Sequence, residues 1–67
     1  MEILKQTRIK ENFTFKEMAE KIGISESLYQ KLEYGVRTPS IKVIHKLKKI
    51  YPDLDTNIFF DQQLHEM

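Results

Sequence analysis

The sequence predicts an all-α fold of five helices, and three observations carry this prediction. Apolar residues recur with helical spacing, no stretch alternates in the manner of a strand, and residues that start and stop helices punctuate the chain. With 67 residues, the chain has room for one domain at most. We expect a single domain over residues 1–67, with a core at about 4–60 and a tail at 61–67.

The first two predicted helices have clear boundaries. The first runs from about Glu2 to Glu11 and stops at Asn12, a residue that tolerates a left-handed backbone. The second runs from about Phe15 to Ile22, and a capping box begins it, because Thr14 is followed three residues later by a glutamate. The residues that we expect it to bury are Met18, Ala19 and Ile22.

A tight turn separates the second helix from the third. Gly23 stands where a helix end needs a positive φ, which glycine adopts without a Cβ clash. Ser25 is a good N-cap for the next helix, and Ile24 between them can turn inward against Tyr29. The third helix is expected over about Glu26 to Tyr34, with Gly35 as its stop. This stretch therefore encodes helix, turn, helix.

The remaining helices follow a short loop. Thr38 or Ser40 can cap the fourth helix, which runs from about 41 to 50 and ends before Pro52. Its expected apolar stripe consists of Ile41, Ile44, Leu47 and Ile50. Asp55 can cap a short fifth helix through residues 58–60.

Composition excludes several classes of protein and site. The chain has no cysteine and only two histidines, so it has no disulfide and no thiolate metal site, and a histidine cluster is not expected. No apolar stretch approaches the ~20 residues of a membrane span, and the first residues lack the apolar core of a signal peptide. We therefore expect a cytoplasmic protein without cofactor, metal or membrane contact.

Charge is unevenly distributed along the chain although its net value is only +1. Residues 41–52 carry four lysines and no acid, whereas residues 53–67 carry four acids and no lysine or arginine. Two interpretations remain open at this point. The lysines form a face that suits an anion, or they are the ordinary solvated side of a helix.

The third predicted helix has two unlike sides on a helical wheel. Leu28, Tyr29 and Leu32 cluster on one side, and the other side consists of Glu26, Ser27, Gln30, Lys31 and Tyr34. Short polar side chains on a helix that a preceding helix supports suit the major groove of DNA, where lysine pairs with guanine and glutamine with adenine. Most surface helices are also polar on one side, so spacing alone does not decide the function.

The stretch "FTFKEMAEKIGISESLYQKLEYGVRTPSIKVIHKLKKI" resembles the Cro/C1-type helix-turn-helix family, also called the XRE family of bacterial and phage repressors. The resemblance covers about Leu4 to Phe60 and rests on Ala19, the "IGIS" turn, "LEYG" and "TPS". It implies a five-helix, lambda-repressor-like domain whose third helix reads double-stranded operator DNA, usually as a homodimer.

The resemblance also implies roles for individual residues. The positions that correspond to base contacts are Glu26, Ser27, Gln30 and Lys31, and those near phosphates are Ser25, Tyr34, Arg37 and Ser40. Arg8 and Glu33 match an architectural ion pair. Three positions depart from the family pattern. Glu26 places a carboxylate at the start of the reading helix, where it suits the helix dipole and can accept from a cytosine amino group but otherwise repels phosphates. Phe15 stands where relatives have a glutamine that donates to a phosphate, so this contact is lost or the ring serves packing, and Thr7 stands where relatives bury a leucine.

Three adjacent apolar residues, Ile58, Phe59 and Phe60, cannot all point inward from one short helix. The family commonly dimerises through this region, so we assign these residues to a homodimer contact; closure of the small core is the competing interpretation.

The predicted function is a sequence-specific transcription regulator, in particular a repressor of a palindromic operator. The alternative is a protein-interaction module, such as an antitoxin or a phage or mobile-element adaptor with the same fold, in which a protein partner replaces or accompanies DNA. An enzyme is not expected, because the sequence has no nucleophile–base arrangement, no glycine-rich phosphate loop and no ligand cluster.

Overall fold

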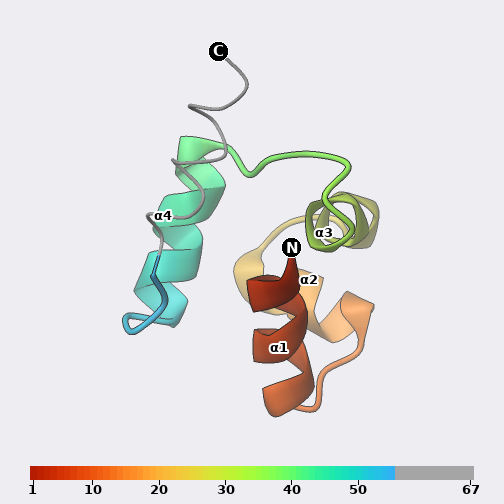
Figure 1. Ribbon diagram of the computed structural model, residues 1–67, viewed down its shortest axis with the longest axis horizontal. Coiled ribbons are helices and arrows are strands. Elements are labelled where there is room, and N and C mark those ends of the chain that lie inside the picture. Colours follow the sequence, from red (N-terminus) through yellow and green to blue (C-terminus); the bar gives the residue numbers. More distant parts are fainter. Residues whose placement is uncertain (56–67) are drawn as a thin grey trace. The chain divides into compact units, whose positions relative to one another are not determined.

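A computed structural model describes residues 1–55, and these residues form four α-helices with no strand among them. The helices are α1 (Glu2–Lys10), α2 (Phe15–Ile22), α3 (Glu26–Glu33) and α4 (Ile41–Ile50) (Figure 1). The predicted all-α class is confirmed for this part of the chain, whereas the predicted fifth helix and tail lie outside the described residues. The chain forms two compact units, Met1–Arg37 with α1 to α3 and Thr38–Met67 with α4.

A left-handed residue follows each of the three helices of the first unit, as predicted, and the one after α2 is Gly23. Asn12 has φ 59° and Gly35 has φ 77°. After α1, the Asn12 N–H donates to the Ile9 carbonyl over 2.9 Å and the Phe13 N–H donates to the Arg8 carbonyl over 3.1 Å. This pair of bonds is a Schellman motif, which satisfies carbonyl groups that the end of a helix leaves open.

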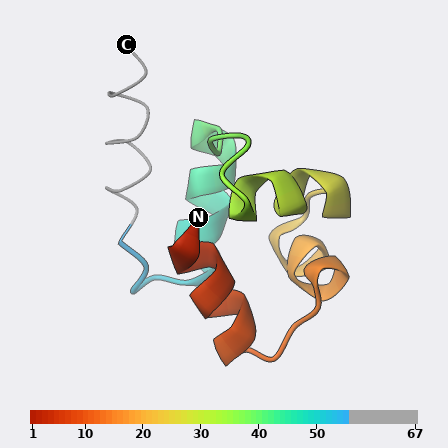
Figure 2. The same ribbon diagram turned by 45° about the vertical axis from the view of Figure 1, so that its right-hand side comes forward.

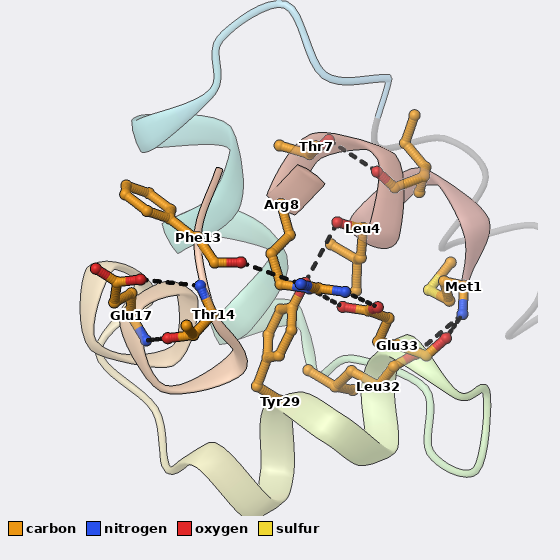
Figure 3. Close-up of polar contacts among 11 residues, drawn as sticks. Met1, Leu4, Thr7, Arg8, Phe13, Thr14, Glu17, Tyr29, Leu32 and Glu33 are labelled. Atoms are coloured by element: carbon orange, nitrogen blue, oxygen red, sulfur yellow. Dashed lines mark hydrogen bonds and ion pairs between the residues drawn. The ribbon is translucent and has the colours of Figure 1, made fainter. Parts of the chain in front are cut away.

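Side-chain and backbone caps begin α2 and form the turn between α2 and α3. Thr14 Oγ1 accepts from the Glu17 N–H over 3.1 Å, and Glu17 Oε1 accepts from the Thr14 N–H over 2.9 Å, so the predicted capping box is present (Figure 3). Gly23, with φ 87°, ends α2, and its N–H donates to the Ala19 carbonyl over 2.8 Å. Ser25 Oγ then accepts from the Leu28 N–H over 3.1 Å. The predicted helix-turn-helix corner is confirmed.

The core of the first unit lies where α3 contacts α1 and α2. Its buried apolar side chains are Leu4, Met18, Ala19, Ile22, Tyr29 and Leu32. Figures 1 and 2 show α3 leading from the turn after α2 back toward the start of α1. Leu28, which the helical wheel places with the buried side chains, is only half-buried. It lies about 100° around the helix from Tyr29, at the edge of the buried stripe.

In the second unit, Ser40 and not Thr38 caps α4. Ser40 Oγ accepts from the Val43 N–H over 3.2 Å, and α4 ends at Ile50, two residues before Pro52. After the helix, the Leu54 N–H donates to the Tyr51 carbonyl over 3.0 Å, and Lys48 Nζ donates to the Leu54 carbonyl over 3.1 Å.

The predicted stripe of α4 is wrong at its first residue. Ile41 is 57% exposed, and the buried side chains of the helix are Val43, Ile44 and Leu47. A helical side chain leans toward the N-terminus and covers the preceding turn. At the first position of a helix no such turn exists, so the Ile41 side chain extends past the helix end. Ile50 is half-buried. None of the helices formed by residues 1–55 has the length and apolar character needed to cross a lipid bilayer.

Candidate nucleic-acid interface

The outer side of α3 is polar and carries charges of both signs. Glu26, Ser27 and Lys31 are exposed. Gln30 is half-buried, and its Nε2 donates to Glu26 Oε2 over 3.3 Å, one helical turn away. Of the four residues predicted to contact bases, three are therefore exposed, and the fourth is hydrogen-bonded to one of them.

The chain that leaves α3 adds an exposed aromatic residue and a cation in the same unit. Tyr34, the C-cap of α3, is 66% exposed, and Arg37 is also exposed. The Gly35 N–H donates to the Leu32 carbonyl over 3.2 Å and the Val36 N–H to the Lys31 carbonyl over 2.9 Å. This second Schellman motif sets the path of the segment that holds two of the predicted phosphate contacts.

The other two predicted phosphate contacts are helix caps. The hydroxyl groups of Ser25 and Ser40 each accept a backbone hydrogen bond at the start of a helix. Ser40 belongs to the second unit, where α4 has no acidic residue in its first turn, whereas Glu26 follows Ser25 directly. A positive helix end without an acidic side chain suits an anion, so Ser40 fits a phosphate role better than Ser25 does.

The inner side of α3 is held by an ion pair between Arg8 and Glu33. Arg8 Nε donates to Glu33 Oε2 over 2.9 Å, and Nη2 donates to Glu33 Oε1 over 3.0 Å (Figure 3). Arg8 Nη1 donates to the Phe13 carbonyl over 3.0 Å. The Arg8 side chain is 16% exposed and the Glu33 side chain is 3% exposed. One guanidinium group thus ties α1 to the connection before α2 and to the end of α3.

The electrostatics of this cluster favour the charged pair. Burial by itself raises the pKa of Glu33, but the hydrogen bonds from Arg8 and the positive charge of Arg8 outweigh burial and hold that pKa below its usual value. The hydrogen bond with Glu33 raises the pKa of Arg8. Burial raises the pKa of Tyr29, whose hydroxyl group donates to the Leu4 carbonyl over 3.3 Å (Figure 3).

Phe15 packs against other side chains, which decides between the two interpretations left open by the sequence. The centroid of its ring lies 4.4 Å from Arg8 Cζ, 6.1 Å from the ring centroid of Tyr29 and 5.9 Å from that of Tyr34. The contact with Tyr34 is edge-on, at an interplanar angle of 67°. A phenyl ring has no donor for a phosphate, so α2 begins with a packing residue.

Sequence reasoning missed several contacts that join distant segments. Arg8 reaches the Phe13 carbonyl, Tyr29 reaches the Leu4 carbonyl, and the ammonium group of Met1 donates to the carbonyls of Leu32 and Glu33. Backbone carbonyls have no residue-type signal, so nothing in the sequence marks them as partners. Thr7 is half-buried, and its hydroxyl group donates to the Ile3 carbonyl over 2.7 Å, within α1.

This arrangement can recognise the surface of a partner. A helix fixed on one side and polar on the other offers a carboxylate, a hydroxyl, an amide and an ammonium group to a partner, which is the range of groups that base edges accept. Within residues 1–55, no cluster of histidine and acidic side chains could hold a metal ion.

A family model described as helix-turn-helix matches residues 4–56, which is most of the chain and covers α1 from its third residue and all of α2 to α4. No curated protein and no protein of solved structure matches the chain.

Proposed function

Because the chain belongs to the Cro/C1-type helix-turn-helix family, the XRE family of DNA-binding regulators, we propose that it is a repressor that binds a palindromic operator as a homodimer. The observation that carries the proposal is the two-sided character of α3. Its buried side is fixed by the pair between Arg8 and Glu33, while Glu26, Ser27 and Lys31 face solvent.

In this proposal α3 enters the major groove. Lys31 suits a guanine, Gln30 an adenine, and Glu26 the amino group of a cytosine. Glu26 also repels phosphates, so it disfavours any placement of α3 that brings this carboxylate close to the DNA backbone. Tyr34, Arg37 and the start of α4 at Ser40 contact phosphates, which set the register but carry no sequence information.

The match over residues 4–56 supports a single domain, since it extends across both compact units. We propose the homodimer contact at Ile58, Phe59 and Phe60, which lie outside the described residues, from their apolar sequence. Two copies related by twofold symmetry would present their reading helices about 34 Å apart on one face of DNA. A regulator of this kind acts where the genome of a bacterium or phage is read, in the cytoplasm.

Selection of bound sequences from a random pool of duplex DNA tests the proposal. We expect a palindromic consensus, and we expect the affinity for it to fall steeply with salt, because basic side chains displace counterions from phosphates. Sedimentation of the wild type and of Phe59→Ser tests the dimer. A pool without a consensus, or a flat response to salt, would contradict DNA reading.

A protein partner is the second candidate, and one observation favours it. Val36 is 70% exposed and follows the exposed Tyr34 by two residues. Together they leave apolar side chains exposed after the end of α3. Co-purification of a partner at equal stoichiometry that Val36→Ser abolishes, together with no DNA consensus, would favour this candidate over the repressor.

A further inference from the structure

Phe15 occupies a position that links the buried and the exposed sides of the first unit. It is half-buried at the first position of α2, beneath the guanidinium group of Arg8 and beside the buried ring of Tyr29. Its third neighbour is the ring of Tyr34, which is 66% exposed. The three aromatic rings therefore form a series from the core to the surface, with Phe15 in the middle.

The two outer members of this series differ in how they are held. Tyr29 is fully buried, and a hydrogen bond from its hydroxyl group to the Leu4 carbonyl holds it to α1. Tyr34 is the C-cap residue of α3, and its ring meets that of Phe15 edge-on with centroids 5.9 Å apart. Edge-to-face contact of this kind restricts the orientation of an aromatic ring.

Restriction of Tyr34 matters because an exposed side chain loses rotamer freedom when a ligand immobilises it. A side chain that is already held in the bound orientation avoids that loss, which is the general benefit of preorganisation. A tyrosine hydroxyl group is a neutral donor that suits a phosphate oxygen. The restriction therefore favours any contact that Tyr34 makes with the DNA backbone.

We propose that Phe15 is a positioning residue, whose ring holds Tyr34 in the orientation in which its hydroxyl group donates to a DNA phosphate. The first residue of α2 thus contributes to DNA binding without touching DNA. This inference rests on the proposed function, and it adds a residue at the start of α2 that acts on the phosphate contact through Tyr34.

A double-mutant cycle on the full chain tests the inference, with the selected duplex as the probe. Tyr34→Phe removes the hydroxyl group and keeps the ring, and we expect roughly tenfold weaker binding per chain from the loss of one hydrogen bond to a charged oxygen. Phe15→Leu should produce most of the same loss. The double variant should bind within about twofold of Tyr34→Phe, because both changes remove the same contact.

Three controls separate positioning from a general loss of structure. Phe13→Leu removes a half-buried ring two residues away, whose neighbour is Lys21 Nζ at 5.1 Å, and should leave affinity unchanged. Phe15→Tyr keeps the ring and should retain wild-type affinity. The NMR signals of the Tyr34 ring protons should shift in Phe15→Leu but not in Phe13→Leu, since only the first variant removes the facing ring.

The outcomes separate this inference from the proposed function. Wild-type affinity in Phe15→Leu, losses that multiply in the double variant, or unshifted Tyr34 signals would each overturn the positioning role while DNA binding stands. A wild-type chain that binds no duplex overturns the proposed function itself. A loss of affinity in Phe15→Leu that Phe13→Leu does not show, at equal thermal stability, supports the positioning role.

Discussion

The unit Met1–Arg37 and helix α4 of the second unit use charge in opposite ways. The first unit has seven basic and six acidic residues, and Arg8 and Glu33 among them form a largely buried pair that holds α3. In α4, positions 42, 46, 48 and 49 are lysine, and no acid occurs from 41 to 52. Charge in the first unit holds α3 in place, whereas the lysines of α4 form a run of charge of a single sign.

This difference matters for recognition because attraction and discrimination have different requirements. A helix face with only lysines attracts any polyanion, and salt weakens that attraction for all sequences alike. A face that carries both Glu26 and Lys31 rejects as well as attracts, so it separates one base sequence from another. We expect specificity to arise from α3 and part of the sequence-independent affinity from α4.

The largest effect should follow from removal of Arg8. Arg8→Met leaves the Glu33 carboxylate buried without its partner, and loss of one member of a buried pair costs about 3 kcal/mol of unfolding free energy. Lys21→Met is the matched change at an exposed pair, in which Lys21 Nζ and Glu11 Oε1 lie 3.3 Å apart. It should cost less than about 1 kcal/mol. Urea denaturation measures both, and equal losses would refute the architectural role of Arg8.

Acidification should remove part of the same stabilisation. The folded state holds the pKa of Glu33 below its ordinary value of 4.5, so its contribution is fully present above about pH 4.5 and is lost as pH falls through the lower, folded value. Urea denaturation between neutral and acidic pH should show a steeper loss of stability for the wild type than for Glu33→Gln.

Glu20→Gln, at an exposed glutamate of α2, corrects this experiment for the loss of a carboxylate elsewhere. A difference between wild type and Glu33→Gln that stays constant across the range of pH would show that ionisation of Glu33 does not stabilise the fold.

Base discrimination should depend on Lys31 and not on the lysines of α4. Lys31→Gln should lower the preference for the selected operator over a duplex changed at one base pair by about 1–3 kcal/mol, the range for one good base contact. Lys42→Gln makes the same chemical change in α4 and should leave that preference intact. Competition binding measures the preference of both variants. An equal loss in Lys31→Gln and Lys42→Gln would contradict the assignment of base discrimination to α3 alone.

Local chemistry made the boundaries of the four helices in residues 1–55 predictable to within one residue. Thr14, Ser25 and Ser40 cap helices, and Asn12, Gly23 and Gly35 adopt positive φ, because these effects depend on residues within a few positions of one another. The exposure of Ile41 was not predictable from periodicity, since a helical wheel has no end and the real helix does.

The contacts of Phe15 were beyond the sequence for another reason. Its neighbours Arg8, Tyr29 and Tyr34 come from α1, from the middle of α3 and from the C-cap of α3, so only the packing of three helices brings them together. The resemblance to a family predicted the pair between Arg8 and Glu33, but it could only mark Phe15 as a departure. A residue that departs from the family pattern has to be understood from its surroundings in this chain.

The smallest effect should come from α4. Lys42 and Lys49 are exposed and lie seven residues, about two turns, apart on one side of the helix. If each neutralises one phosphate, Lys42→Gln with Lys49→Gln should reduce the slope of log affinity against log salt by about two, with the same consensus sequence. Lys5→Gln with Lys10→Gln removes the same charge from exposed positions of α1 and should change the slope less. Equal changes in slope would mean that α4 contributes only net charge, and the lysines of residues 41–52 would then be an ordinary solvated face.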